Sequence, residues 1–361
     1  MTGSLRNELA WEILLATPMI IVFFILWACG FIVTARFFGL RVGVPPAVSM
    51  RVSVIIPARD EEHNLPRLLE SLAAQSVRPY EVLVVDDGST DSTAEIARKL
   101  GADVIESAPL PDGWRGKTWA CHQGALKASG GHFLFMDADT WFEVEGLARM
   151  LGRYPGGAFS LLPYHAVSKS YEDFSLFFNF SMTAGTVPNG LAGQCFLINR
   201  EDYQKVGGHE SVRGRVLENF RLAEEFREAG IPVCSAIGSE MVSFRMYPQG
   251  FRSLVEGWTK GFASGAVRTP LWILLLVVGW MTGLMFPLLG GMMTGDWKLW
   301  LAAYALGAFQ VAGISRRIGS FHWLGIFFYP IPLMFFFGVF GWSALRSGKK
   351  VSWKGREIHA D

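Results

Sequence analysis

The sequence predicts an α/β domain with a mainly parallel sheet, flanked on both sides by membrane-spanning helices. Two observations predict this architecture. Strand-like segments alternate with helical segments between residues 50 and 248, and four long stretches outside that region carry no charged residue. The composition points the same way, because only 18% of the residues are charged, against roughly 25% in soluble proteins.

The four charge-free stretches are Ile13–Ala35, Thr269–Gly295, Leu299–Ser315 and Ile318–Leu345, with 23, 27, 17 and 28 residues. A spanning helix needs about 20 apolar residues, so we interpret all four as membrane helices rather than as buried helices of a soluble protein. The first is predicted to be a retained anchor, because no cleavage site follows it.

These signals divide the chain into five parts. We predict an N-terminal anchor and linker (1–49), a soluble domain (50–248), an interfacial amphipathic segment (249–268), about three membrane helices (269–345) and a basic tail (346–361).

Basic residues flank the soluble domain on the membrane side, namely Arg36, Arg41, Arg51, Arg252, Lys260 and Arg268. The positive-inside rule therefore predicts a multi-pass protein of the cell membrane with this domain in the cytoplasm. The basic tail favours a cytoplasmic C-terminus as well, which three full spans do not allow. Either the tail departs from the rule, or one segment, such as that holding Pro330 and Pro332, is re-entrant.

Each element of the α/β domain has a local signal. Strands are expected at residues 52–57, 81–86, 102–106 and 132–136, which are short β-branched or aromatic runs. Helices are expected at 65–75, 92–100, 117–129 and 216–230, from leucines at helical spacing or from closing glycines such as Gly101 and Gly230. Ligands of such sheets bind at the carboxyl ends of the strands.

Acidic side chains follow three of the predicted strands, in the segments PARDEE (57–62), DDGS (86–89) and DAD (137–139). Each alone is weak, since a DDGS segment is often only a capped turn. Together they place carboxylates at one sheet edge, where they repel one another unless a cation or a ligand rich in donors joins them. Carboxylate oxygens suit Mg²⁺ or Mn²⁺, so the edge predicts a metal–nucleotide site.

In order and spacing, these three motifs resemble the family-2 inverting glycosyltransferases of GT-A fold, over about residues 50–262. The resemblance implies a UDP-sugar donor, with Asp60 and Asp87 at the uracil and ribose, Lys117 of GKTWACHQG at the nucleotide, and Asp137 and Asp139 as the diphosphate and metal motif. The implied donor-binding residues are Pro57, Arg59, Asp60, Glu62, Asp87, Lys117 and Asp137, and Asp139 is the implied ligand of Mg²⁺ or Mn²⁺.

The general base of this family normally lies in a Glu-Asp pair that opens a helix. Here the pair is Glu218-Asn219, and asparagine cannot accept a proton. Either Glu218 is the base, or the acceptor is already ionised and Glu218 orients it. A third interpretation makes Glu218 a first-turn carboxylate that the helix dipole favours.

The segments RMYPQGF and EGWTKGFASGA resemble the Gln…Arg-Trp block of membrane synthases, although Gly257 stands where arginine is expected. These two segments, together with GWRGK, resemble the carotenoid-type and hopanoid-associated members of the family more closely than they resemble the membrane synthases. We assign to the acceptor or diphosphate side Gln194, Arg245, Arg252, Trp258 and Lys260. Arg252, Trp258 and Lys260 would equally suit an interfacial helix.

Phe174, Phe177 and Phe178 share one helical face, which predicts either core packing or a surface that guides a lipid to the site. The histidines His63, His122, His165 and His209 show no metal-ligand spacing, and neither do the cysteines Cys29, Cys121, Cys195 and Cys234, so we predict structural histidines and buried thiols in a reducing compartment.

The predicted function is transfer of a hexose, most simply glucose, from a UDP-sugar to a membrane-embedded lipid or carotenoid-type acceptor. The alternatives are a polyprenyl-phosphate or ceramide-type glycosyltransferase, a processive polysaccharide synthase, and a non-catalytic nucleotide-sugar-binding membrane protein. No nucleic acid is expected as a partner, because 33 basic residues against 32 acidic ones leave no basic excess.

Overall fold

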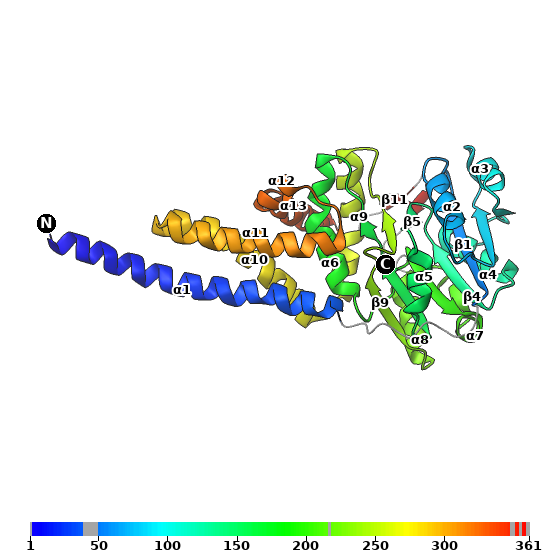
Figure 1. Ribbon diagram of the computed structural model, residues 1–361, viewed down its shortest axis with the longest axis horizontal. Coiled ribbons are helices and arrows are strands. Elements are labelled where there is room, and N and C mark those ends of the chain that lie inside the picture. The colour runs from blue at the N-terminus through cyan, green and yellow to red at the C-terminus, as the bar shows by residue number, and fades with distance from the viewer. Residues whose placement is uncertain (1, 39–49, 216–217, 347–350, 354–355, 359–361) are drawn as a thin grey trace. The chain divides into compact units, whose positions relative to one another are not determined.

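A computed structural model describes residues 2–38, 50–215, 218–346, 351–353 and 356–358 (Figure 1). The chain forms two compact units. The sheet unit consists of Gly39–Ala166, Thr186–Gly250 and Arg346–Asp361, and the helical unit consists of Met1–Phe38, Val167–Gly185 and Phe251–Leu345. Arg41 and most of the predicted basic tail lie outside the described residues.

The sheet unit contains a seven-stranded sheet of order β3-β2-β1-β4-β8-β6-β9. The strands are β1 (Val52–Ala58), β2 (Glu81–Asp86), β3 (Asp103–Glu106), β4 (His132–Met136), β6 (Ala158–Leu162), β8 (Cys195–Asn199) and β9 (Val233–Ile237). The first four are parallel, β9 is parallel to β6, and β8 is antiparallel to both neighbours. The predicted mainly parallel sheet is therefore confirmed.

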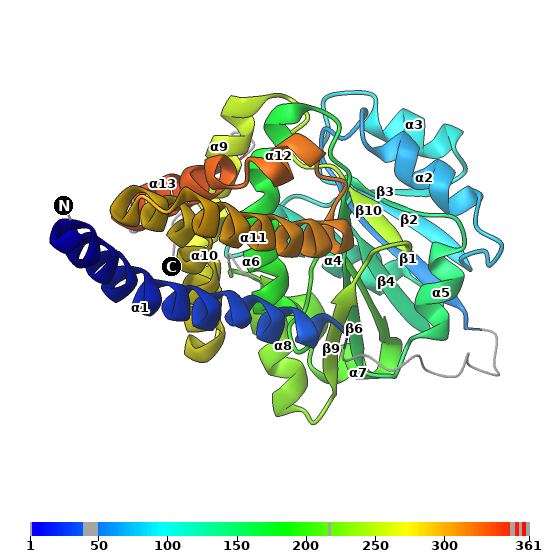
Figure 2. The ribbon, with the colours of Figure 1, turned by 60° about the vertical axis from the view of Figure 1, so that its left-hand side comes forward.

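Helices cover both faces of this sheet (Figure 2). On one face lie α2 (Leu65–Ala73), α3 (Thr93–Lys99) and α5 (Gly146–Gly152), and on the other lie α4 (Gly116–Lys127), α7 (Arg200–Lys205) and α8 (Glu218–Glu228). Strand β1 serves both cores because its side chains alternate: Ile56 packs towards α2 and Ile55 towards α4. Gly124 lets α4 approach closely, since an added Cβ would lie 2.4 Å from Ile55 Cγ2.

A second sheet, of order β5-β10-β7, contains the strand that directly follows the DAD motif. Its strands are β5 (Thr140–Phe142), β7 (Tyr164–His165) and β10 (Val242–Phe244). In the antiparallel β5–β10 pair, Phe244 lies opposite Thr140, so Arg245 leaves β10 where Asp139 enters β5. The remaining described elements of this unit are η3 (Gly208–Val212), β11 (Val351–Trp353) and β12 (Arg356–Ile358).

The helical unit consists of α1 (Thr2–Ala35), η1 (Arg36–Phe38), η2 (Ser170–Ser175), α6 (Leu176–Thr186), α9 (Phe251–Arg268), α10 (Leu271–Thr294), α11 (Trp297–Ile318), α12 (Trp323–Phe327) and α13 (Pro330–Arg346). Helices α1 and α10 pack closely, because a Cβ on Gly283 would lie 2.7 Å from Leu26 Cβ. The buried Gln310 amide joins three helices, since it accepts from Trp280 Nε1 at 2.7 Å and donates to the Trp27 carbonyl at 3.1 Å. Small residues and buried polar links of this kind are typical of packed membrane helices.

Two helical segments of the described chain are long and apolar enough to cross a membrane, Ala16–Ala35 and Leu271–Thr294. Two of the four predicted spans do not meet this standard. Helix α11 carries charged residues at both ends, and the run 318–345 is divided between α12 and α13, where Pro330–Ser343 is a shorter apolar helix. The run 318–345 is thus one charge-free stretch in the sequence but two helices in the structure, because a turn separates α12 from α13.

Replacing Gly283 with leucine is expected to destabilise the helical unit by about 1–3 kcal/mol, because the new side chain has no room between α10 and α1. Gly313→Leu is the matched control, since an added Cβ there meets nothing within 4 Å. Thermal unfolding of the detergent-solubilised protein, followed by circular dichroism, checks this. Equal transition temperatures for the two variants would contradict it.

Candidate functional site

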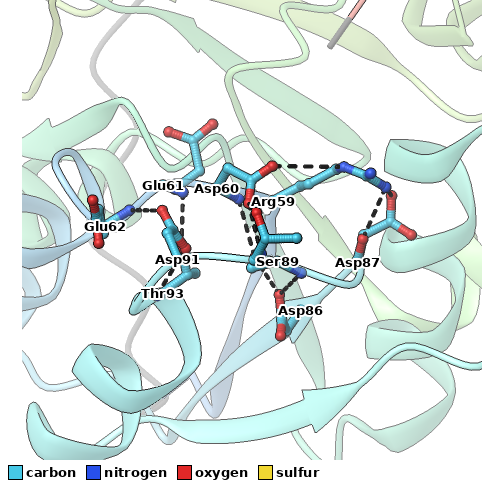
Figure 3. A network of polar contacts seen from close by, with 10 residues as sticks. Arg59, Asp60, Glu61, Glu62, Asp86, Asp87, Ser89, Asp91 and Thr93 are labelled. Carbon is cyan, nitrogen blue, oxygen red and sulfur yellow. Dashed lines mark hydrogen bonds and ion pairs between the residues drawn. The ribbon is translucent and has the colours of Figure 1, made fainter. Parts of the chain in front are cut away.

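The loops that follow β1 and β2 are tied together at their tips (Figure 3). Asp60 has a positive φ of 52°, and its Oδ1 accepts from the Thr90 backbone N–H at 2.8 Å. Its own backbone N–H donates to Ser89 Oγ at 3.0 Å. These bonds hold Asp60 of PARDEE against the DDGS turn, so the two predicted donor motifs form one surface.

Within the same network, some carboxylates serve the loops themselves (Figure 3). Asp86 Oδ1 accepts from the Ser89 backbone N–H at 3.0 Å, and Asp91 Oδ2 accepts from that of Glu62 at 3.1 Å. Glu62 Oε2 in turn accepts from the Ser92 N–H at 3.2 Å. Asp86, Asp91 and Glu62 are therefore engaged in turn formation, and for Asp86 this agrees with the capped turn that a DDGS segment often forms.

Asp87 points instead towards Arg59 (Figure 3). Arg59 Nη1 lies 3.7 Å from Asp87 Oδ2 and donates to the Asp87 carbonyl at 3.1 Å. Pro57 pairs with Val85 in the register of β1 and β2, one residue before Asp86. The structure thus brings Pro57, Arg59 and Asp87 together at the carboxyl ends of two neighbouring strands.

Lys117 links three elements of the sheet unit. Its Nζ lies 2.6 Å from Asp137 Oδ1, after β4, and 3.9 Å from Glu218 Oε1, at the start of α8. Burial alone would lower the pKa of Lys117, but Asp137 and Glu218 raise it above its usual value, so the amine stays charged. Burial raises the pKa of Glu218, and Lys117 opposes that rise.

The sequence-predicted base and diphosphate residues are thus neighbours through one lysine. Residues 216–217, the predicted start of the Glu218 helix, lie outside the described residues. Arg115 of the segment GWRGK, which was not predicted as a site residue, adds positive charge near Glu218, and its Nε donates to the Gly214 carbonyl at 3.1 Å. Its position directly before GKTW was the available signal.

Asp139 has the electrostatic surroundings of a cation ligand. Burial, and then the carboxylates of Asp137 and Glu61, raise its pKa to about 7. A divalent cation would reverse this penalty, so the residues fit Mg²⁺ or Mn²⁺. No group of three or more His, Cys, Asp or Glu side chains able to hold a metal occurs in the described parts of the chain. The cation would therefore complete its shell with donor phosphates and water, as Mg²⁺ commonly does.

Asn219 fills a tight space beside the loop that precedes β8. Its Nδ2 donates to Glu218 Oε1 at 3.1 Å, and a Cβ on Gly193 would lie only 1.7 Å from that Nδ2. The next residue, Gln194, accepts the Asp137 backbone N–H at 3.0 Å through its carbonyl. Gly193 is thus a missed site residue, because it allows the start of α8 to approach the diphosphate motif.

Arg245, which was predicted for the acceptor or diphosphate side, also lies in the sheet unit. Arg245 leaves β10 beside Asp139, as the strand register requires. Tyr247, two residues later, has a positive φ of 57°, and burial together with Asp139 raises its pKa above the usual value.

His209, which was predicted to be structural, is buried, and its Nδ1 lies 2.8 Å from Tyr203 Oη. Burial, Lys117 and His122 lower the pKa of His209 to about 3, so it stays neutral.

The other predicted acceptor-side residues belong to α9 in the helical unit. Trp258 is buried, stacks on Phe178 with centroids 4.7 Å apart, and donates from Nε1 to Ser175 Oγ at 3.0 Å. Arg252 pairs with Glu256 at 3.0 Å on the surface, and the Lys260 side chain lies outside the described part of the chain. Phe177 and Phe178 are fully buried, so core packing describes these two phenylalanines.

Replacing Lys117 with methionine is expected to lower kcat/KM by roughly tenfold to a hundredfold, because a charge-assisted bond worth about 1.5–3 kcal/mol is lost. Asp137 and Glu218 would then face each other without the cation that joins them. Lys127→Met is the control, as Lys127 lies exposed in the last turn of the same helix. Initial rates of nucleotide release from both variants make the comparison, and equal rates would contradict the expectation.

Comparison with known proteins agrees with this geometry. Residues 53–206 match the family described as Glycosyl transferase family 2. The 4,4'-diaponeurosporenoate glycosyltransferase of Staphylococcus aureus (strain USA300) is 34% identical over 353 residues, covering 91% of this chain and 94% of that protein. The mannosyltransferase PcManGT from Pyrobaculum calidifontis, solved with GDP-Man and Mn²⁺, shares 17% identity and a TM-score of 0.52 over 89% of this chain and 95% of that one.

The likeness to the mannosyltransferase shows that the sheet and its helices form a GT-A, Rossmann-like α/β fold. The length and identity of the match to the staphylococcal enzyme show more than the fold. The chain is an enzyme, related to a carotenoid glycosyltransferase, and it belongs to glycosyl transferase family 2.

Proposed function

We propose that this enzyme transfers a hexose, most simply glucose, from a UDP-sugar to a membrane-embedded lipid or carotenoid-type acceptor, with inversion at the anomeric carbon. The contact of Lys117 with both Asp137 and Glu218 carries the proposal. Because one lysine contacts both carboxylates, Glu218, which we assign to the acceptor, and Asp137, which we assign to the donor diphosphate, are neighbours, and this supports the proposal. A single in-line displacement needs this proximity of donor and acceptor groups.

On the donor side, the tied loops of Asp60 and Asp87 would hold the uracil and ribose. Lys117 would turn from Asp137 to the diphosphate, because its raised pKa keeps it positively charged. Asp139 would hold Mg²⁺ or Mn²⁺, which would neutralise negative charge on the leaving diphosphate. The mannosyltransferase that shares the fold binds GDP-Man and Mn²⁺, which supports a nucleotide-sugar donor and a divalent cation.

On the acceptor side, the staphylococcal relative is named for a carotenoid acid. The two candidate spans, Ala16–Ala35 and Leu271–Thr294, support an acceptor that enters from the bilayer of the cell membrane. The basic residues that flank the sheet unit in the sequence, such as Arg36 and Arg252, support its placement in the cytoplasm. Polyprenyl-phosphate and ceramide-type transferases would use the same donor residues. The difference lies only in the acceptor, so one product analysis separates them.

The test uses the full chain in lipid nanodiscs with Mn²⁺, UDP-glucose and a bacterial lipid extract. Release of UDP together with a hexosylated apolar lipid, identified by mass spectrometry, is the expected result. Parallel reactions with UDP-galactose and GDP-mannose establish the donor. Hydrolysis of UDP-glucose without a lipid product, or faster transfer to free sugars than to any lipid, would contradict the proposal.

A further inference from the structure

Three phenylalanines from three different elements meet on the helical unit. Phe174 of η2 lies 5.6 Å from Phe251 of α9 and 4.8 Å from Phe335 of α13, between ring centroids, and Phe251 and Phe335 are 5.6 Å apart. Phe251 is 45% exposed, and Phe174 and Phe335 are half-buried. Each ring therefore contacts the other two and still presents surface outwards. We name Phe174, Phe251 and Phe335 the aromatic wall.

Buried neighbouring residues support the aromatic wall. Phe178 lies 6.0 Å from Phe335 and stacks on Trp258, whose indole is fixed by Ser175. Asp173, the residue before Phe174, accepts from the His322 backbone N–H at 2.9 Å and lies 3.0 Å from His322 Nδ1. These contacts hold η2 against the start of α12. The rings are thus set in place before any ligand arrives, which lowers the entropic cost of binding.

The wall differs chemically from most of the surface of the two candidate spans. Exposed apolar side chains on α1 and α10 include many flexible aliphatic ones, such as Ile21, Ile25, Leu271, Leu275, Met292 and Met293. Phe174 packs edge to face with both other rings of the wall, and Phe251 and Phe335 are tilted at 45° to each other, so the cluster offers a rigid aromatic surface suited to a conjugated or isoprenoid chain. Polar groups adjoin it, because Arg252 follows Phe251 and pairs with Glu256 at 3.0 Å.

The chain order connects the wall with the site in the sheet unit. Helix α9 begins with Phe251, and the segment RMYPQGF joins that residue to Arg245, which leaves β10 beside Asp139. In chain order, this segment therefore leads from a charged residue that follows β10 to the first ring of the aromatic wall.

We propose that the aromatic wall binds the elongated apolar body of the acceptor, a polyene or polyisoprenoid chain, and so selects acceptors of this shape. The proposal rests on the proposed function, since it assumes a lipid acceptor. The wall adds a binding site for the part of the acceptor that takes no part in the chemistry. Its contribution is to acceptor affinity and not to the transfer step.

A photoreactive probe tests the proposal without requiring turnover. The probe is a C20 isoprenoid carrying a diazirine near its apolar end, applied to the full chain in nanodiscs and mapped by mass spectrometry. Cross-links on Phe174, Phe251, Phe335 or their immediate neighbours are expected, and excess unlabelled isoprenoid should remove them. Labelling confined to the lipid-facing surfaces of α1 and α10 would overturn the proposal.

Matched variants make the test quantitative. Phe251→Ala is expected to reduce wall labelling and to raise the acceptor KM by about tenfold, because an aromatic contact is lost, while kcat and the KM for UDP-glucose stay unchanged. Phe251→Trp should restore both values. Phe309→Ala is the control, because Phe309 is 81% exposed and lies on α11, an element that contributes no ring to the wall. Equal losses in Phe251→Ala and Phe309→Ala would show general lipid partitioning and overturn the proposal.

The two proposals fail in different ways. Intact labelling of the wall without any hexosylated lipid would contradict the proposed function and leave the wall as an isoprenoid-binding site. If lipid glycosylation is normal, the wall is not labelled and the acceptor KM of Phe251→Ala is unchanged, only the proposal that the aromatic wall binds the acceptor would be overturned.

Discussion

Replacing Asp139 with asparagine is expected to reduce sugar transfer by about a thousandfold, since a metal ion contributes several kcal/mol of charge stabilisation to such a reaction. Asparagine preserves the size of the side chain and removes the negative charge that would hold the cation. Burial and the neighbouring carboxylates penalise the charge of the wild-type side chain and raise its pKa to about 7. Divalent-cation dependence should therefore be lost together with turnover.

The measurement is UDP release from UDP-glucose as a function of Mn²⁺ concentration, for the wild type and for Asp139→Asn. Asp103→Asn is the matched control, because Asp103 is an exposed aspartate on β3 of the same sheet. Circular dichroism should show that both variants keep the wild-type fold. Full activity of Asp139→Asn, or wild-type activity that survives EDTA, would contradict a metal-dependent mechanism.

The same carboxyl predicts a pH dependence of cation binding. Only the deprotonated form of Asp139 can ligate a cation, and its pKa is raised to about 7 by burial and by Asp137 and Glu61. Protons should therefore compete with Mn²⁺, so the Mn²⁺ concentration needed for half-maximal activity should rise as the pH falls below about 7. Calorimetric Mn²⁺ titrations at several pH values measure this, and a pH-independent affinity would contradict it.

Local sequence signals were sufficient for the elements that position the donor residues. Strands β2 and β4 begin and end where their apolar runs predict, and the leucines of α2 are buried as their helical spacing requires. The convergence of three acidic motifs followed from one rule, that parallel strands end at a common edge. The carboxylate pattern therefore carried enough information to locate the candidate site.

Long-range pairing was beyond these signals. Strand β8 lies between β4 and β6, antiparallel to both, although it is far from each in the sequence. Residues Val167–Gly185 leave the predicted soluble domain and join the helical unit, where Phe177 and Phe178 are buried. Apolar periodicity shows that a face is buried but does not name its partner. The same limit applies to the candidate site: the contact of Lys117 with Glu218 joins positions far apart in the chain, so local sequence patterns could not predict it.

Replacing Glu218 with glutamine is the second large expected effect, a loss of about 10²–10⁴ in kcat if Glu218 is the general base for a hydroxyl acceptor. It is the carboxylate of the Glu218-Asn219 pair, and its Oε1 lies 3.9 Å from Lys117 Nζ and 3.1 Å from Asn219 Nδ2. A base must be deprotonated to act. Burial raises the pKa of Glu218, so Glu218 should become protonated at a higher pH than an ordinary carboxyl group does. The wild-type rate should therefore begin to fall at that higher pH as the pH is lowered.

The opposite result identifies a different acceptor. A carboxylic acid, such as that in the name of the staphylococcal relative, is ionised at neutral pH because a carboxyl group titrates near about 4, so it attacks without a base. Glu218→Gln would then keep near wild-type rates across about pH 5–8, and the product would be a hydroxylamine-sensitive glycosyl ester. Asn219→Asp is the companion variant: an added negative charge beside Glu218 should repel an ionised acceptor and raise its KM, whereas a hydroxyl acceptor has no charge to be repelled. Rates, acceptor KM and product linkage measured together for both variants therefore decide whether Glu218 accepts a proton or only orients the nucleophile.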